Sequence, residues 1–178
     1  MATSRNVLRD EVALPPVRKT TVVPLDQRGA FDLFIRRLPE WWPLRTRSVG
    51  GEDADSCHVE AVTGGRLYER SRAGAESLWG RFKLLDEPAR AVFSWHPGLP
   101  ETAATEVEVQ FTPLGAQTRV ELEHRHWERL GARASFVRGM FDSDAGWTGV
   151  LARLRALAGG TELPPVEGPG CLSDLDHP

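Results

Sequence analysis

The sequence has little of what would identify a chemistry at once. Its 178 residues include only two cysteines, Cys57 and Cys171, which are too few for a disulfide framework and fit a reducing compartment. No apolar run approaches the length of a membrane span, and the N-terminus lacks the apolar stretch of a secretory signal. We therefore expect a cytoplasmic protein that does not insert in a membrane.

Strong charge of one sign is also missing. The formal net charge is −3, and although Lys19 and Lys83 are the only lysines, aspartate and glutamate offset the arginines. Such a chain is not expected to bind nucleic acid or an anionic membrane. The sequence contains no nucleophile elbow, phosphate-binding loop, dinucleotide fingerprint or zinc-finger spacing. We accordingly predict no cofactor and no metal, and we assign no catalytic residue.

Tryptophan, by contrast, is abundant. Six tryptophans stand against one tyrosine, and they are Trp41, Trp42, Trp79, Trp95, Trp127 and Trp147. Tryptophan supplies a large, rigid apolar area with one hydrogen-bond donor. These residues either fill a core or form the walls of an aromatic cavity.

Residues 104–127 carry the clearest local pattern, a period of two interrupted by Pro113, Leu114 and Gly115. One face of this pattern is Thr105, Val107, Val109 and Phe111 before the interruption, and Val120, Leu122, His124 and His126 after it. Alternation around a turn predicts a β-hairpin with one covered face. Because that face changes from aliphatic residues to imidazoles, it is typical of a sheet that lines a cavity.

Composition divides the chain into one domain and two tails. Residues 1–16 are polar and end in two prolines, and residues 159–178 are rich in glycine and proline. Both segments are expected to be flexible, and residues 17–158 are expected to form a single domain.

Periodicity predicts the elements of that domain. Strands are expected at residues 17–23, 57–63, 66–72, 77–85 and 90–96, in addition to the two of the hairpin. A first helix is expected to begin after Asp26 and end at Pro39, and a short aromatic turn follows at residues 41–43. A long final helix is expected to begin at Ser143 or Asp144, whereas residues 128–141 lack clear periodicity.

This order predicts an α+β fold. A curved seven-stranded antiparallel sheet would wrap around the long C-terminal helix, with two short helices between the first and second strands. Twist and curvature leave space between the sheet and the helix near one end, where a small-molecule site would lie.

Several motifs, in this order, resemble the helix-grip fold of the START-like proteins in the SRPBCC superfamily, and most closely the homologues of the activator of the heat-shock chaperone ATPase. The motifs are PEWWPLRTRSVGG (39–51), GGRLYER (64–70), LWGRF (78–82), AVFSWH (91–96), VEVQFTPLGAQTRVELEHRHW (107–127) and GW (146–147). The resemblance implies the fold over residues 17–158 but no single activity, because the superfamily contains lipid carriers, polyketide cyclases, hormone receptors and co-chaperones.

The two histidines are the first candidate site residues. His124 and His126 share a strand face by period two, and there they would hydrogen-bond a ligand, move a proton, or serve the structure alone. A metal site would need a third ligand such as His96 or Glu69. Relatives usually have a small residue where this chain has His126, so the pair is not part of the family pattern.

The remaining candidates are acidic, basic and aromatic. Glu69 either faces inward with Arg81 as its partner or forms an exposed cross-strand pair. The candidate cavity walls are Trp79, Phe93, Trp95, Phe111, Phe136, Met140 and Trp147. Each of these has core packing as its alternative role.

Three functions follow from these observations. The first is binding of a small hydrophobic or aromatic molecule in the cavity, without chemistry. The second is a chaperone- or protein-interaction module, in which Trp41 and Trp42 contact the partner. The third is a polyketide cyclase-like or related enzyme, such as a hydrolase or dehydratase, that uses His124 or His126 as a general base, with Glu69 or Arg81 orienting an oxygen. The oligomeric state is expected to be monomer or homodimer.

Overall fold

The computed structural model describes residues 13–168, so residues 1–12 of the predicted tail 1–16 and residues 169–178 of the predicted tail 159–178, with Cys171, lie outside the described residues. It contains a seven-stranded antiparallel sheet in the order β1-β7-β6-β5-β4-β3-β2. The strands are β1 (Val17–Val23), β2 (Ala54–Val59), β3 (Arg66–Ser71), β4 (Glu76–Asp86), β5 (Arg90–Trp95), β6 (Thr105–Leu114) and β7 (Gln117–Arg125). The predicted fold class is therefore confirmed.

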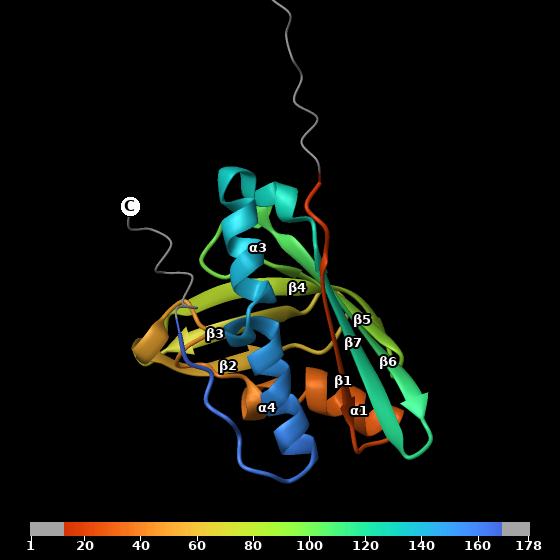
Figure 1. The fold of residues 1–178 in the computed structure, drawn as a ribbon. Helices are drawn as coiled ribbons and strands as arrows, with labels where there is room; N and C mark the ends of the chain where they lie inside the picture. Colours follow the sequence, from red (N-terminus) through yellow and green to blue (C-terminus); the bar gives the residue numbers. More distant parts are fainter. Residues whose placement is uncertain (1–12, 169–178) are drawn as a thin grey trace, which may run out of the picture.

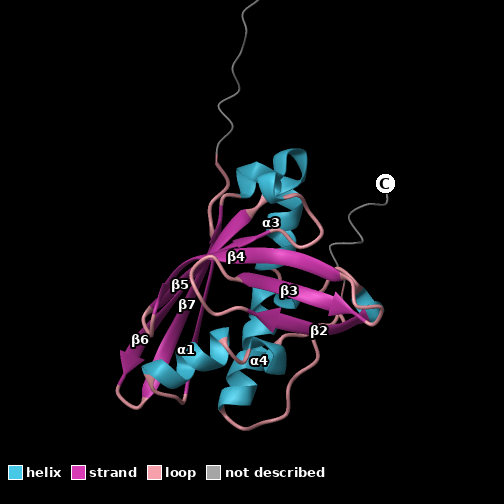
Figure 2. Cartoon of the chain, turned by 180° about the vertical axis from the view of Figure 1, so that it is seen from behind, coloured by secondary structure: helices cyan, strands magenta, loops and turns pink. Residues whose placement is uncertain are grey.

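The helices gather on the concave side of the curved sheet. They are α1 (Gln27–Ile35), α2 (Leu38–Trp41), α3 (Ala134–Asp142) and α4 (Gly149–Ala158). In Figure 1 α3 and α4 lie in front of the strands, and the reverse view in Figure 2 has the strands in front of them. Among the described residues, no helix is long and apolar enough to cross a membrane.

The β6–β7 hairpin has the predicted register. Val107 lies opposite His124, and Phe111 lies opposite Val120. The predicted inward face is buried as far as His124. β7 ends at Arg125, however, and His126 adopts a left-handed conformation with φ of 69°, outside the strand. The prediction that His124 and His126 share one strand face is therefore wrong, because the backbone turns between them.

The first helical region is divided differently from the prediction. The Asp26 side chain accepts a hydrogen bond from the Gly29 amide (2.7 Å) and caps α1 as expected. α1 already ends at Ile35, and Pro39 lies in the first turn of α2 instead of ending α1. Proline is tolerated there because its missing N–H has no helical partner at that position.

The C-terminal helical region is also broken. α3 occupies part of the segment without clear periodicity, and the irregular turn Asp144–Thr148 separates it from α4. Gly146 has ψ of −133°, which is not helical, so the final helix does not begin at Ser143 or Asp144. Val150, Leu151 and Leu154 of α4 are buried in the core that also contains the inward face of the sheet.

The chain after α4 packs on the domain as far as it is described. Val166 is buried, and the Pro164 carbonyl accepts a hydrogen bond from Arg153 (2.7 Å). The expectation of a flexible tail from residue 159 missed these contacts, because a proline- and glycine-rich composition does not show that Val166 finds an apolar site.

Candidate functional site

A small apolar pocket lies where the loop after α2, the end of β5 and the α3–α4 junction meet. Its volume is about 40 Å³, which is room for a few water molecules. Its lining residues are Trp42, Arg47, Ser48, Trp95, Pro97, Met140, Phe141, Ala145, Gly146, Trp147 and Val150. We call this site the tryptophan pocket, since three of its walls are indoles.

Trp42 is the centre of the aromatic cluster beside this pocket. Its ring centroid lies 5.5 Å from those of Trp79 and Trp95, and 6.0 Å from that of Trp147. Tilted and edge-to-face arrangements at these distances are favourable packing. The indole rings therefore pack against one another beside the pocket, within a core that also contains phenylalanine and aliphatic side chains.

The predicted cavity walls divide into three groups. Trp95, Met140 and Trp147 line the tryptophan pocket. Trp79, Phe93 and Phe111 are buried in the core and do not line it. Phe136 is 64% exposed on the surface of α3, so its prediction as a cavity wall is wrong. Residues 128–141 gave no periodicity from which the orientation of Phe136 could be read.

His124 is completely buried within a directed chain of hydrogen bonds. The Trp147 indole N–H donates to its Nδ1 (3.0 Å), so the neutral ring carries its proton on Nε2. That nitrogen lies 2.7 Å from the Thr105 hydroxyl, which in turn donates to the Trp95 carbonyl (2.9 Å). These hydrogen bonds link the α3–α4 junction, β7, β6 and β5, and they use both ring nitrogens of His124.

The surroundings of His124 also hold it neutral. Burial lowers the pKa of the imidazole well below its ordinary value. The rings of Trp127 and Phe141 pack against it, with centroids 4.1 and 4.7 Å away. A general base needs a free lone pair and access to substrate, and His124 has neither in this arrangement.

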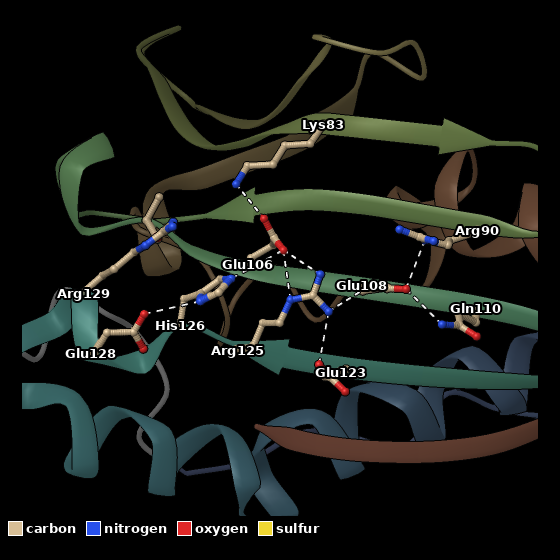
Figure 3. A network of polar contacts seen from close by, with 11 residues as sticks. Lys83, Arg90, Glu106, Glu108, Gln110, Glu123, Arg125, His126, Glu128 and Arg129 are labelled. Atoms are coloured by element: carbon tan, nitrogen blue, oxygen red, sulfur yellow. Dashed lines mark hydrogen bonds and ion pairs between the residues drawn. The ribbon is translucent and has the colours of Figure 1, made fainter. Parts of the chain in front are cut away.

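His126 lies instead in a network of charges on the other side of the sheet, and its side chain is 39% exposed. Its ring nitrogens lie 3.3 Å from Glu128 and 3.8 Å from Glu106 (Figure 3). Glu106 also accepts hydrogen bonds from Lys83 and Arg125, both at 2.6 Å. His126 therefore does not line the tryptophan pocket.

Glu69 faces inward, but its predicted partner is wrong. The carboxylate is 2% exposed and accepts hydrogen bonds from the amides of Val49 (2.8 Å) and Gly50 (2.6 Å). The Trp79 indole N–H is a third donor, at 2.6 Å. Arg81 is exposed and donates to the Gly64 carbonyl (3.3 Å) instead. Glu69 thus fixes the loop beside the tryptophan pocket to the sheet.

Arg47 holds the other side of the same loop. Its guanidinium donates to the carbonyl of Ala145, in the α3–α4 junction (3.1 Å from Nε), and to those of Glu167 and Gly168 (both 3.3 Å). Arg47 therefore ties together the loop after α2, the junction and the C-terminal segment, and it forms the polar edge of the pocket.

The sequence interpretation missed most of the residues that line the tryptophan pocket. Those not predicted are Trp42, Arg47, Ser48, Pro97, Phe141, Ala145, Gly146 and Val150. The tryptophan-rich turn and the Gly-Trp motif were available as signals, because they flank the pocket on its two sides. Among the described residues there is no cluster of histidine, cysteine and carboxylate side chains that could hold a metal. Cys57 is buried, and burial raises the pKa of its thiol to about 12, which makes it unreactive.

Comparison with solved structures identifies similar proteins. CalC from Micromonospora echinospora, described as a self-sacrificing resistance protein, is 32% identical, with 82% of this chain and 95% of CalC covered and a TM-score of 0.62. The anthrahydroquino-γ-pyrone synthase Txn09 is 31% identical, with coverage of 82% and 97% and a TM-score of 0.58. The Aha1 dimer from Colwellia psychrerythraea shares the fold, at 14% identity, coverage of 82% and 96%, and a TM-score of 0.57.

Comparison with curated proteins gave no match. The family model for the Activator of Hsp90 ATPase homolog 1-like proteins matches residues 35–159, which span α2, the whole sheet except β1, and the C-terminal helices. This match agrees with the motif resemblance and with the helix-grip architecture. The chain therefore belongs to the family of Activator of Hsp90 ATPase homolog 1-like proteins, within the SRPBCC superfamily.

Proposed function

We propose that this protein binds a flat, largely apolar polycyclic molecule at the tryptophan pocket. The observation that carries this proposal is the convergence of three indole walls, Trp42, Trp95 and Trp147, on an opening edged by Arg47 and Ser48. Flat aromatic faces with a few polar groups at the rim are typical of sites for ring systems. The names of Txn09 and CalC, a pyrone synthase and a resistance protein, direct the search to polycyclic natural products.

The pocket must enlarge to take such a ligand. A volume of about 40 Å³ is far below the several hundred Å³ of ordinary ligand sites. The wall able to yield is the α3–α4 junction, where Gly146 interrupts the helix and Met140 is only half-buried. An opening that is rarely populated lowers the apparent affinity by the populated fraction, so we expect modest affinity for the unmodified protein.

A proton-transfer role for His124 or His126 gains no support, because one ring is enclosed in hydrogen bonds and the other lies outside the pocket. Cyclisation by holding a reactive chain in a folded shape needs no such base. Binding is thus the common requirement of the carrier and cyclase functions, and it is the property to test first.

The test uses 1,8-dihydroxyanthraquinone as probe and quenching of tryptophan fluorescence as readout. Met140→Ala enlarges the pocket, and Met140→Trp fills it, so we expect them to change the Kd in opposite directions, each by about five- to tenfold. Phe136→Ala on the exposed face of the same helix is the control and should leave the Kd within twofold. Absence of saturable quenching, or equal effects of all three variants, would overturn the proposal.

A second candidate is a protein-interaction module, and one observation favours it. Phe136 is 64% exposed and lies beside Met140 in a shallow surface hollow formed by α3 and the junction. Trp41 is fully buried, so the predicted partner contact through Trp41 is wrong. The test titrates purified Hsp90 with the wild-type protein and with the Phe136→Ser variant. Binding of the wild type together with loss of binding in the variant would support this function. No complex at micromolar concentration would remove Hsp90 as a partner.

A further inference from the structure

A second, larger pocket shares Trp42 with the tryptophan pocket, but all its other lining residues are different. Its volume is about 570 Å³, which is within the range of small-molecule sites. The loop after α2, the start of β2, α4 and the C-terminal segment form its walls. Trp42, Leu44 and Val166 are apolar lining residues, and Arg45, Arg72 and Arg153 are the cationic ones. We call it the arginine pocket.

The guanidinium groups of these three arginines have N–H donors that form no hydrogen bond with the described residues. Arg153 donates through Nε to the Trp41 carbonyl (2.8 Å) and through Nη1 to the Pro164 carbonyl (2.7 Å), which leaves Nη2 without a described partner. The side chains of Arg45 and Arg72 have no hydrogen-bond or ion-pair partner among the described residues. Three arginines from three separate segments therefore face one hollow with most of their N–H groups unused.

Among the described residues, the carboxylates of the same pocket form no direct ion pair with these arginines. Asp55 and Glu167 line it, but neither forms an ion pair within the described part of the chain. Arg153 is half-buried and has no carboxylate partner among the described residues, and this burial lowers the pKa of its guanidinium. An anion entering the pocket would supply a negatively charged partner.

We propose that the arginine pocket binds the anionic group of a small organic molecule, either a phosphate monoester or a carboxylic acid. Arginine forks match the oxygen geometry of both groups in bidentate hydrogen bonds. The apolar surfaces of Trp42, Leu44 and Val166 then contact the organic part of the same ligand. This site is separate from the tryptophan pocket, and the proposal does not depend on binding there.

In the experiment, the full chain is titrated with phenyl phosphate, benzoate and phenol. Binding is measured by calorimetry and by the arginine Nε–H signals in nitrogen-resolved NMR. We expect phenyl phosphate to bind with a Kd of about 1 mM or tighter and to shift the Arg153 signal. Arg45→Gln and Arg72→Gln should each weaken binding about tenfold, the size of one charge-assisted contact. The matched control is Arg81→Gln, an exposed arginine on β4 outside the pocket, which should change the Kd less than twofold.

The outcomes are distinct. Benzoate binding at the same arginines would support the shared anion chemistry, and tighter phenyl phosphate binding would assign the site to phosphates. Equal weakening by Arg81→Gln would show non-specific attraction and overturn the site. Phenol binding as tightly as phenyl phosphate would show that the charge is irrelevant, and no saturable binding by 10 mM, roughly the weakest affinity of interest, would remove the proposal altogether.

Discussion

At the scale of single residues, the buried polar groups of this protein serve the structure more than a reaction. His124, Thr105 and Trp147 satisfy one another in a chain whose donors and acceptors are all assigned. Glu69 is satisfied by three N–H donors without any cationic partner. Groups arranged in this way rigidify a core and are costly to leave half-satisfied.

Replacing His124 by leucine should therefore destabilise the protein strongly. The Trp147 N–H would lose its acceptor and the Thr105 hydroxyl would lose a partner, so we expect the free energy of unfolding to fall by about 2–4 kcal/mol. Urea denaturation measures it. His126→Asn is the control, because asparagine tolerates the left-handed conformation and the site is half-exposed. Equal losses in both variants would contradict the structural role given to His124.

Replacing Glu69 by glutamine tests the three-donor site. The new amide group would bring N–H donors to a position that already receives three, and we expect a loss of about 1–3 kcal/mol. Glu60→Gln, at an exposed carboxylate paired with Arg66, should cost less than about 1 kcal/mol. Thermal melts of both proteins at pH 7 give the comparison, and a Glu69→Gln protein as stable as wild type would show that the donors find other acceptors.

At the scale of elements, the α3–α4 junction decides how the pocket closes. Gly146 occupies a position where any Cβ would collide with the carbonyl oxygens of Met140 and Phe141. Gly139, only seven residues earlier, lies in α3 with open space around the position of a Cβ. The same substitution at the two glycines should therefore have opposite effects.

We expect Gly146→Ala to destabilise the protein by about 1–3 kcal/mol through overpacking and to change the shape of the tryptophan pocket. Gly139→Ala should stabilise it by about 0.4–1 kcal/mol, because alanine reduces the entropy of the unfolded chain in a compatible helix. Chemical denaturation of both variants, with the anthraquinone titration alongside, provides the measurement. A stabilised Gly146→Ala protein would mean that the junction is not held as described.

At the scale of the whole molecule, His124 and Glu106 contribute to the dependence of stability on pH in two different pH ranges. The pKa of His124 is lowered in the folded state, so its contribution is present above its unfolded pKa of about 6.5 and is lost as the pH falls below it. For Glu106, burial raises the pKa, but hydrogen bonds from Lys83 and Arg125 outweigh it and the net pKa is lowered. Its contribution is lost only below the unfolded value of about 4.3.

Stability should therefore decline in two stages on acidification. Between about pH 6.5 and 4.5 the free energy of unfolding of the wild type should fall by up to about 1.4 kcal/mol per pH unit because of His124. A His124→Gln variant should show a flatter profile over that range, while both proteins lose stability steeply below about pH 4.3. Urea midpoints at half-unit pH steps measure the two profiles. Parallel profiles for both proteins would exclude His124 as the origin of the first stage.

The sequence by itself determined the architecture and the family. Period-two alternation predicted all seven strands to within a few residues, since a sheet with one covered face requires that pattern. Asp26 indicated the start of the first helix through its capping side chain, and six motifs in order indicated the family. These features depend on neighbours in the chain, which is why they can be read from it.

Only the tertiary structure decided which side chains meet. The turn after Arg125 sends His126 to the outer face, and no pattern in the sequence marks that left-handed residue. α3 escaped prediction because its burial comes from contacts with distant segments and leaves Phe136 exposed. Two of the three donors to Glu69 are the backbone amides of Val49 and Gly50, about twenty residues earlier in the chain. The arginine pocket joins residues from 42 to 167. Contacts between distant segments depend on how the sheet curves and how the helices pack. Local periodicity in the sequence therefore does not predict them.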